Sequence, residues 1–182
     1  MVVMGMSAGG LRALEKILGA LPADFGIPIV AVQHRARESE AFAALMQSHC
    51  ALPVHDAEDK EPIVTPGVYL APPDYHLLVE PGYLALSTDE PVSYSRPSID
   101  VLFESAADAY GAGVLAVLLT GANADGSRGL VRIREAGGFT IVQDPLTAES
   151  PEMPNAAILA RAADRVLPLA GIAAELVRRS RS

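Results

Sequence analysis

Three short polar segments of this chain contain the residue types of a serine hydrolase. Ser7 lies in a Gly-x-Ser-x-Gly pattern between an apolar run and a helical pattern, which is typical of a nucleophile elbow. His34 and Asp125 follow two further apolar runs. A serine hydroxyl needs a neighbouring base to take its proton, imidazole suits that task, and a carboxylate can orient the imidazole. These types predict nucleophilic catalysis, with the backbone N–H of Ala8 as one oxyanion donor.

Each of these residues also has a purely structural interpretation. The glycine-rich turn at Ser7 could bind a phosphate on the N–H groups of the following helix. His34 could be a structural residue at a strand end, and Asp125 could be a helix N-cap or a turn residue. Asp144 also follows a predicted strand and is a rival acid, although the proline after it favours a turn. Cys50 is a rival nucleophile, but no glycine-rich turn surrounds it and free cysteine usually behaves as a small hydrophobe.

Hydrophobic periodicity predicts alternating strands and helices around these segments. Strands are expected over residues 2–6, 29–33, 114–119, 139–142 and 165–167. Helices are expected over residues 8–21, 39–49, 99–110, 125–136, 152–162 and 169–179, the second and third capped by Ser39 and Ser98. This alternation predicts an α/β fold with a doubly wound, mostly parallel sheet and helices on both faces. Functional residues of such folds gather at the carboxyl ends of the strands.

The middle of the chain has a different pattern. Residues 52–95 contain short extended pieces at 68–70, 76–79 and 83–86, separated by turn dipeptides such as Pro81-Gly82. This pattern predicts small strands, or an antiparallel hairpin, attached to the main sheet.

Composition limits the classes of function. The length predicts one domain, 1–182, and the net charge of −8 argues against nucleic-acid binding, which needs a basic face. The longest apolar run, 114–119, is far short of the roughly 18 residues that span a bilayer, so we expect no membrane insertion. A single cysteine allows no internal disulfide and indicates a cytoplasmic protein. The four histidines lack metal-ligand spacing, so we expect neither metal nor cofactor.

Six segments in order along the chain carry a resemblance to a known family. They are Met-Gly-Met-Ser-Ala-Gly-Gly at 4–10, Gln-His at 33–34, Tyr-Leu-Ala-Pro-Pro-Asp-Tyr-His at 69–76, Arg-Pro-Ser-Ile-Asp-Val-Leu-Phe at 96–103, Leu-Leu-Thr-Gly at 118–121 with Asp-Gly at 125–126, and Met-Pro at 153–154 with Ala-Ala at 156–157. Together they resemble the catalytic domain of the CheB-type chemotaxis methylesterases. That family hydrolyses γ-glutamyl methyl esters on the cytoplasmic signalling helices of chemoreceptors and releases methanol, and some members deamidate receptor glutamines.

The resemblance implies a role for each matching residue. It makes Ser7 the nucleophile, His34 the general base and Asp125 the orienting acid, in a chain order unlike the Ser, Asp, His order of α/β-hydrolases. It adds the backbone N–H of Ala122 as a second oxyanion donor, although the family commonly has Met-Gly where this chain has Ala122-Asn123. His76 matches a family histidine near the site, with no assigned role.

The resemblance also implies partners. The expected substrate is the cytoplasmic domain of a methyl-accepting chemoreceptor, and family members often carry an N-terminal receiver domain, whereas here Met1 directly precedes the first strand. We therefore expect a trimmed or stand-alone esterase, with a signalling system other than chemotaxis as the alternative setting. An acidic receptor would need a locally positive site mouth. Candidate arginines are Arg35, Arg37, Arg96 and Arg128. A non-catalytic anion-binding module and an interaction module with vestigial catalytic residues are the alternatives.

Overall fold

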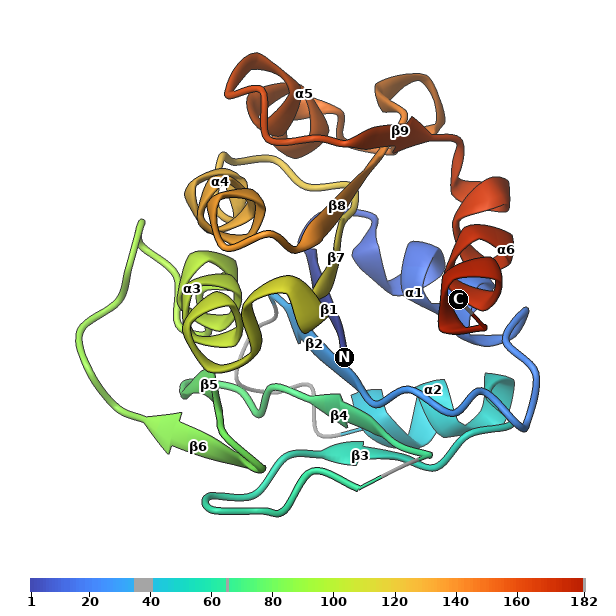
Figure 1. The fold of residues 1–182 in the computed structure, drawn as a ribbon, viewed down its shortest axis with the longest axis vertical. Coiled ribbons are helices and arrows are strands. Elements are labelled where there is room, and N and C mark those ends of the chain that lie inside the picture. Colours follow the sequence, from blue (N-terminus) through green and yellow to red (C-terminus); the bar gives the residue numbers. More distant parts are fainter. Residues whose placement is uncertain (35–40, 65, 182) are drawn as a thin grey trace.

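The chain folds around a seven-stranded parallel sheet, in a computed structural model that describes residues 1–34, 41–64 and 66–181 (Figure 1). The strand order is β3-β4-β2-β1-β7-β8-β9. The strands are β1 Val2–Met6, β2 Ile29–Gln33, β3 Val54–Asp56, β4 Val68–Leu70, β7 Leu115–Leu118, β8 Phe139–Gln143 and β9 Arg165–Leu167. Every pairing in this sheet is parallel, which confirms the predicted doubly wound α/β fold.

Helices cover both faces of the sheet, as Figure 1 shows. On one face lie α1 Gly10–Leu18, α2 Phe42–His49 and α6 Leu169–Ser180. On the other lie α3 Ile99–Tyr110, α4 Ser127–Glu135 and α5 Glu152–Leu159. Successive side chains of a strand point to opposite faces, so Met4 of β1 packs with the first group and Val3 with the second. Because both faces are buried, the strands read as continuous apolar runs in the sequence.

The middle region forms a separate two-stranded antiparallel hairpin, as expected. Its strands are β5 His76–Glu80 and β6 Tyr83–Ser87, and they pair antiparallel from His76–Ser87 to Glu80–Tyr83. The turn between them uses Gly82 at φ 89°, a conformation that favours glycine. Leu77 and Leu84 of the hairpin are buried in the same core as α3, so the hairpin lies against that helix. The strand at Val54–Asp56 was not predicted, because three residues at a sheet edge give little periodicity.

Several helices are shorter than predicted. Helix α1 begins only at Gly10, since Gly9 before it has a left-handed conformation with φ 77°. Helix α4 begins at Ser127 for the same reason, because Gly126 has φ 92°. Helix α5 ends at Leu159 rather than at residue 162. Ser39, the predicted cap of α2, lies outside the described residues.

Candidate active site

Strand register places Ser7 between the ends of β2 and β7. Met6, the last residue of β1, pairs with Gln33 of β2, and the N–H of His34 donates to the Met6 carbonyl at 3.0 Å. On the other side, the Ser7 N–H donates to the Thr120 carbonyl at 2.9 Å, just after β7. From β1 the sheet grows in one direction through β2 and in the other through β7. Ser7 therefore lies at the switch point where α/β sheets place their functional sites.

Two glycines permit the sharp turn that follows Ser7. Gly9 has φ 77°, and a Cβ at that position would lie 2.6 Å from the Cβ of Glu149. Gly10 donates its N–H to the Ser7 carbonyl at 2.8 Å, and a Cβ there would lie 2.1 Å from Gln33 Oε1. Side chains at either position would therefore collide with neighbouring residues. The sequence signature of a nucleophile elbow corresponds to a real steric requirement here.

His34 and Asp125 are joined by a partly buried hydrogen bond. His34 Nε2 lies 2.8 Å from Asp125 Oδ2, and the Asp125 side chain is fully buried while that of His34 is 12% exposed. Burial by itself would raise the pKa of Asp125, but hydrogen bonds from His34 and from backbone N–H groups of Ile99 and Asp100 outweigh it and lower the pKa. The carboxylate is therefore the acceptor, Nε2 carries the proton, and Nδ1 is the imidazole nitrogen left to act as a base.

The N-terminus of α3 holds the carboxylate of Asp125. Its oxygens accept hydrogen bonds from Ser98 Oγ at 2.9 Å, from the Ile99 N–H at 2.7 Å and from the Asp100 N–H at 3.0 Å. A helix N-terminus presents unpaired N–H groups and a partial positive charge, both of which favour an anion. The interpretation of Asp125 as the cap of its own helix is wrong, because Gly126 is the N-cap of α4 and Asp125 caps a different helix.

The two expected oxyanion donors are open to solvent. Ala8 and Ala122 are exposed residues, and among the described residues neither backbone N–H has a hydrogen-bond partner. The peptides around them are nevertheless held in place. Thr120 Oγ1 donates to the Ala8 carbonyl at 2.8 Å, and the Gly121 N–H donates to the Ser150 carbonyl at 3.0 Å. The two amides can therefore bind a substrate oxygen without breaking an existing bond.

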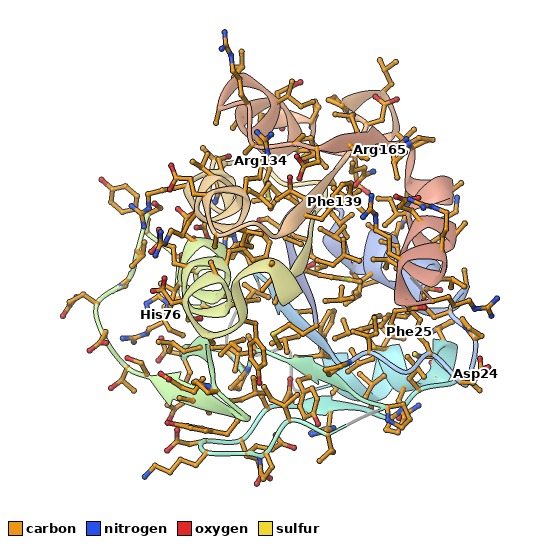
Figure 2. The ribbon with its side chains drawn as sticks, in the orientation of Figure 1. Asp24, Phe25, His76, Arg134, Phe139 and Arg165 are labelled. Carbon is orange, nitrogen blue, oxygen red and sulfur yellow. The ribbon has the colours of Figure 1, made fainter. Side chains whose placement is uncertain are left out.

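His76 lies at the start of β5 and is labelled in Figure 2. It contacts Asp125 only indirectly, through Ser98. It is 1% exposed, and its Nδ1 accepts the Ser98 N–H at 3.2 Å while its Nε2 lies 3.1 Å from the Glu90 carbonyl oxygen. A ring nitrogen that faces a carbonyl must carry the proton, so this hydrogen-bond pattern fits the neutral imidazole. His76 touches Ser98, which in turn touches Asp125, and so it supports the α3 N-terminus rather than facing Ser7.

The rival acid and the rival nucleophile occupy structural positions. The Asp144 side chain accepts the Leu146 N–H at 2.9 Å and caps the short 3-10 helix Pro145–Thr147. Cys50 is buried, and burial raises the pKa of its thiol, so little of it is the reactive thiolate near neutral pH.

The candidate arginines do not supply a free positive patch where the structure describes them. Arg96 binds Asp74 through Nε and Nη2, at 3.1 and 2.8 Å, and its Nη1 donates to the carbonyls of the loop after β6. Arg128 forms a hydrogen bond with Glu104 at 2.6 Å. Arg35 and Arg37 lie outside the described residues.

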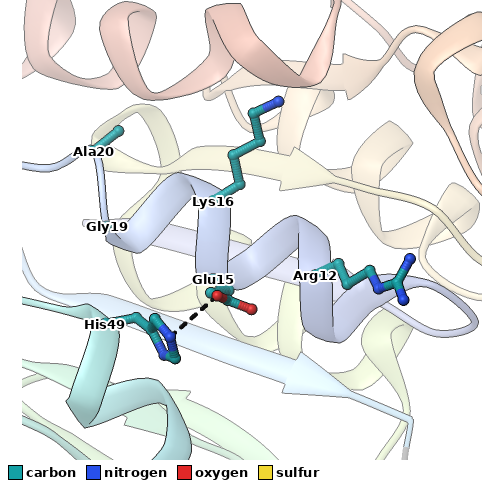
Figure 3. Close-up of a pocket in the computed structure, with 6 residues that line it drawn as sticks. All are labelled: Arg12, Glu15, Lys16, Gly19, Ala20 and His49. Carbon is teal, nitrogen blue, oxygen red and sulfur yellow. Dashed lines mark ion pairs between the residues drawn. The ribbon is translucent and has the colours of Figure 1, made fainter.

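A surface pocket of about 450 Å³, whose lining does not include Ser7, His34 or Asp125, lies between α1 and the end of α2 (Figure 3). Its lining includes Arg12, Lys16 and His49, and the last forms an ion pair with Glu15 at 3.2 Å.

Across residues 1–34, 41–64 and 66–181, no group of three or more metal-ligating side chains comes together. No helix within those ranges is long and apolar enough to cross a bilayer.

Several residues that shape the site had no role there assigned from the sequence. Gln33 binds the carbonyls of Ser7 and His34, Ser98 anchors Asp125, and Thr120 bridges two loops. Gln33 directly precedes His34, and Thr120 directly follows the predicted strand 114–119. These positions were the sequence signal that could have identified them. Ser98 was identified only as a helix cap, a role that it also has.

Gly121 packs directly against Ser7, which gives a testable prediction. A Cβ on Gly121 would lie 2.5 Å from Met153 Cε and 3.0 Å from Ser7 Cβ. We expect Gly121→Ala to lower hydrolytic kcat roughly tenfold or more, because a displacement near 1 Å can cost up to a hundredfold. Gly26→Ala is the matched control, since a Cβ there meets only the Asp24 carbonyl at 3.9 Å. Equal steady-state rates for the two variants would contradict the prediction.

Known proteins show the same family signature and the same fold. The chain matches the CheB methylesterase family over residues 2–176. A relative from Leptospira interrogans, named for protein-glutamate methylesterase and protein-glutamine glutaminase activities, is 49% identical over 179 residues, which are 97% of this chain and 93% of the relative. A protein-glutamate methylesterase/protein-glutamine glutaminase from Rhodospirillum rubrum is 39% identical over 97% of this chain, which spans only 50% of that longer relative.

A solved structure agrees with the sequence comparison. The crystal structure of the Thermotoga maritima CheB methylesterase catalytic domain superposes with a TM-score of 0.95 at 34% identity, over 98% of this chain and 97% of that one. The family match covers almost the whole sequence, and the structural match covers the same span. The chain therefore belongs to the CheB methylesterase family.

Proposed function

We propose that this chain is a protein-glutamate methylesterase/protein-glutamine glutaminase that uses Ser7 as nucleophile, His34 as general base and Asp125 as the orienting acid. The reaction class is that of the family. The observation that supports the residue assignment is the partly buried hydrogen bond between His34 and Asp125, together with the pairing of Met6, which precedes Ser7, with Gln33, which precedes His34. A paired carboxylate stabilises the imidazolium that forms when histidine takes a proton.

The first half of the reaction follows from these positions. Ser7 Oγ attacks the carbonyl carbon of the glutamyl methyl ester while His34 Nδ1 accepts the hydroxyl proton. The carbonyl oxygen becomes an oxyanion, and the N–H groups of Ala8 and Ala122 donate to it. His34 then returns the proton to the departing methoxide, which leaves as methanol, and an acyl-enzyme on Ser7 remains.

The second half uses the same groups with water as nucleophile. His34 Nδ1 takes a proton from water as its oxygen attacks the acyl carbon, and when the tetrahedral intermediate collapses the imidazolium returns that proton to Ser7 Oγ, which releases glutamate and restores Ser7 and neutral His34. For a glutamine substrate the departing group is ammonia instead of methanol. In both cycles Asp125 stays ionised and holds the imidazole, because its hydrogen bonds lower its pKa.

The substrate and setting follow from the family. We propose that residues 1–182 act as one catalytic domain on the cytoplasmic helices of a methyl-accepting chemoreceptor. Relatives such as that of Rhodospirillum rubrum extend well beyond the matched region, so a receiver domain, in the same or another chain, is the proposed regulator. A single buried thiol is compatible with a reducing cytoplasm.

The alternative of an anion-binding module has an observation against it. Glu149 lies beside the turn at Gly9, where its Oε2 is 3.2 Å from the position that a Cβ would occupy. A carboxylate next to the N-terminus of α1 would repel a phosphate bound there. The paired His34 and Asp125 would also have no task in phosphate binding on backbone N–H groups.

The decisive experiment incubates the protein with a methylated chemoreceptor fragment and follows the fragment by mass spectrometry. We expect loss of one methylene mass per hydrolysed ester, release of methanol, and labelling of Ser7 by a fluorophosphonate probe. His34→Ala should lose both the hydrolysis and the labelling, because Ser7 then has no base. His49→Ala, an exposed histidine on α2, is the matched control and should retain both. Phosphate binding that survives His34→Ala, with no hydrolysis by the unaltered protein, would favour the anion-binding module.

A further inference from the structure

Gln33, the last residue of β2, connects the backbones of Ser7 and His34. Its Nε2 lies 2.8 Å from the Ser7 carbonyl oxygen and 2.8 Å from the His34 carbonyl oxygen. Since both partners are acceptors, the amide presents its two N–H groups to them. We propose that Gln33 is a positioning residue that aims one oxyanion donor at the substrate, a role that rests on the function proposed above.

The geometry of one peptide unit carries this inference. The carbonyl of Ser7 and the N–H of Ala8 belong to the same peptide, which is planar and trans, so the two groups point in opposite directions. The Ser7 carbonyl is held from two sides, by Gln33 Nε2 and by the Gly10 N–H, each at 2.8 Å. This peptide cannot rotate without breaking both hydrogen bonds. The Ala8 N–H therefore keeps its direction before substrate arrives, which is the preorganisation that stabilises an oxyanion.

The second N–H of the amide fixes the base. The His34 N–H donates to the Met6 carbonyl at 3.0 Å, and the His34 carbonyl accepts from Gln33. Both backbone groups of His34 are thus bound, one to β1 and one to the side chain that also holds Ser7. A single side chain thereby sets the spacing between the proposed nucleophile and its base.

The oxygen of the Gln33 side-chain amide has an unfavourable environment. Gln33 Oε1 is buried and has no hydrogen-bond partner among the described residues. It faces Gly10, where a Cβ would lie only 2.1 Å from it. A buried acceptor without a partner destabilises a fold, and an unsatisfied group of this kind calls for an explanation. The positioning role of its two N–H groups explains why an amide occupies this site although its oxygen is unpaired.

The test compares two glutamines whose side-chain amides each donate to two backbone carbonyls. Gln47, on α2, also donates through Nε2 to two carbonyls, those of Cys50 and Leu52, each at 3.1 Å, but it lies near the amino end of β3. We expect Gln33→Met to lower kcat by up to about a hundredfold with little change in KM, because the upper limit is the effect of losing the oxyanion donor that Gln33 positions. The rate of Ser7 labelling by a fluorophosphonate should fall by a similar factor. Gln47→Met should keep both rates while losing more thermal stability than Gln33→Met, because Gln47 Oε1 also accepts the Val54 N–H at 2.8 Å.

The outcomes separate this inference from the proposed function. Equal kcat and equal labelling rates for Gln33→Met and Gln47→Met would overturn the positioning role while the hydrolase remains. A wild-type protein that neither labels at Ser7 nor hydrolyses the ester would overturn the proposed function itself. Should Gln33→Met fail to fold, Gln33→Asn carries the same test, because its shorter amide keeps a polar group but cannot reach both carbonyls. A wild-type rate in that folded variant would equally overturn the role.

Discussion

Ser7→Ala should reduce hydrolysis of a methylated receptor fragment by about 10⁶-fold, the order of loss measured when a triad serine is removed. The oxygen of Ser7 is the atom that would form the acyl-enzyme, and no other hydroxyl in the described site follows such a turn. Among the described residues, Ser7 Oγ makes no hydrogen bond, so the folded state loses little when it is removed. Methanol release and the mass of the fragment measure the effect.

A remote serine provides the control for this substitution. Ser48 on α2 is exposed and its Oγ donates to the Leu45 carbonyl at 2.7 Å. Ser48→Ala should retain full activity, and both variants should unfold at temperatures close to that of the unaltered protein. A Ser7→Ala protein that keeps most of its activity would exclude the acyl-enzyme mechanism.

Asp125→Asn should weaken both catalysis and stability. The imidazole of His34 would face an amide in place of a carboxylate, which stabilises the wrong tautomer, and the corresponding change in a serine-protease triad lowers kcat about 10⁴-fold. The Asp125 carboxylate also accepts three hydrogen bonds from residues 98–100. An amide nitrogen facing these donors leaves at least one buried N–H unpaired, at a cost of about 1–3 kcal/mol in the free energy of unfolding. Denaturant unfolding and steady-state kinetics measure the two effects.

The pH dependence of stability provides a second readout for Asp125. Its hydrogen bonds hold the pKa below the ordinary aspartate value, so the ionised group stabilises the fold above about pH 3.9, the value in the unfolded chain. That contribution is lost as the pH falls through the lower pKa of the folded state. We therefore expect the stability difference between the unaltered protein and Asp125→Asn to be constant near neutral pH and to shrink in acid.

A surface aspartate distinguishes this effect from a general change of charge. Asp108 is exposed and pairs with Arg132 at 2.8 Å, and exposed ion pairs contribute only about 0–1 kcal/mol. Asp108→Asn should leave the rate unaltered and change stability little. A similar loss of stability in the two variants would show that the contacts with α3 do not matter.

The positions of the elements followed largely from hydrophobic periodicity. The strands Val2–Met6, Ile29–Gln33 and Arg165–Leu167 have the predicted bounds. The first two are buried on both faces and therefore read as continuous apolar runs between polar segments, whereas the third is a partly exposed edge strand. Helix ends were predicted less well. Gly9 and Gly126 adopt left-handed conformations, so α1 and α4 begin later in the chain than predicted. Such turns depend on close packing rather than on residue type alone.

The sequence by itself determined which residue types could do chemistry and that three of them follow buried strands. Because parallel strands end at one edge of the sheet, this was enough to bring Ser7, His34 and Asp125 into one region. Only the tertiary structure decided how they are held. Asp125 binds the N-terminus of α3, twenty-odd residues before it in the chain, and leaves Nδ1 of His34 as the base. Gln33 joins two backbones in the same way. Hydrogen bonds between segments far apart in sequence depend on directions and distances that no local pattern encodes.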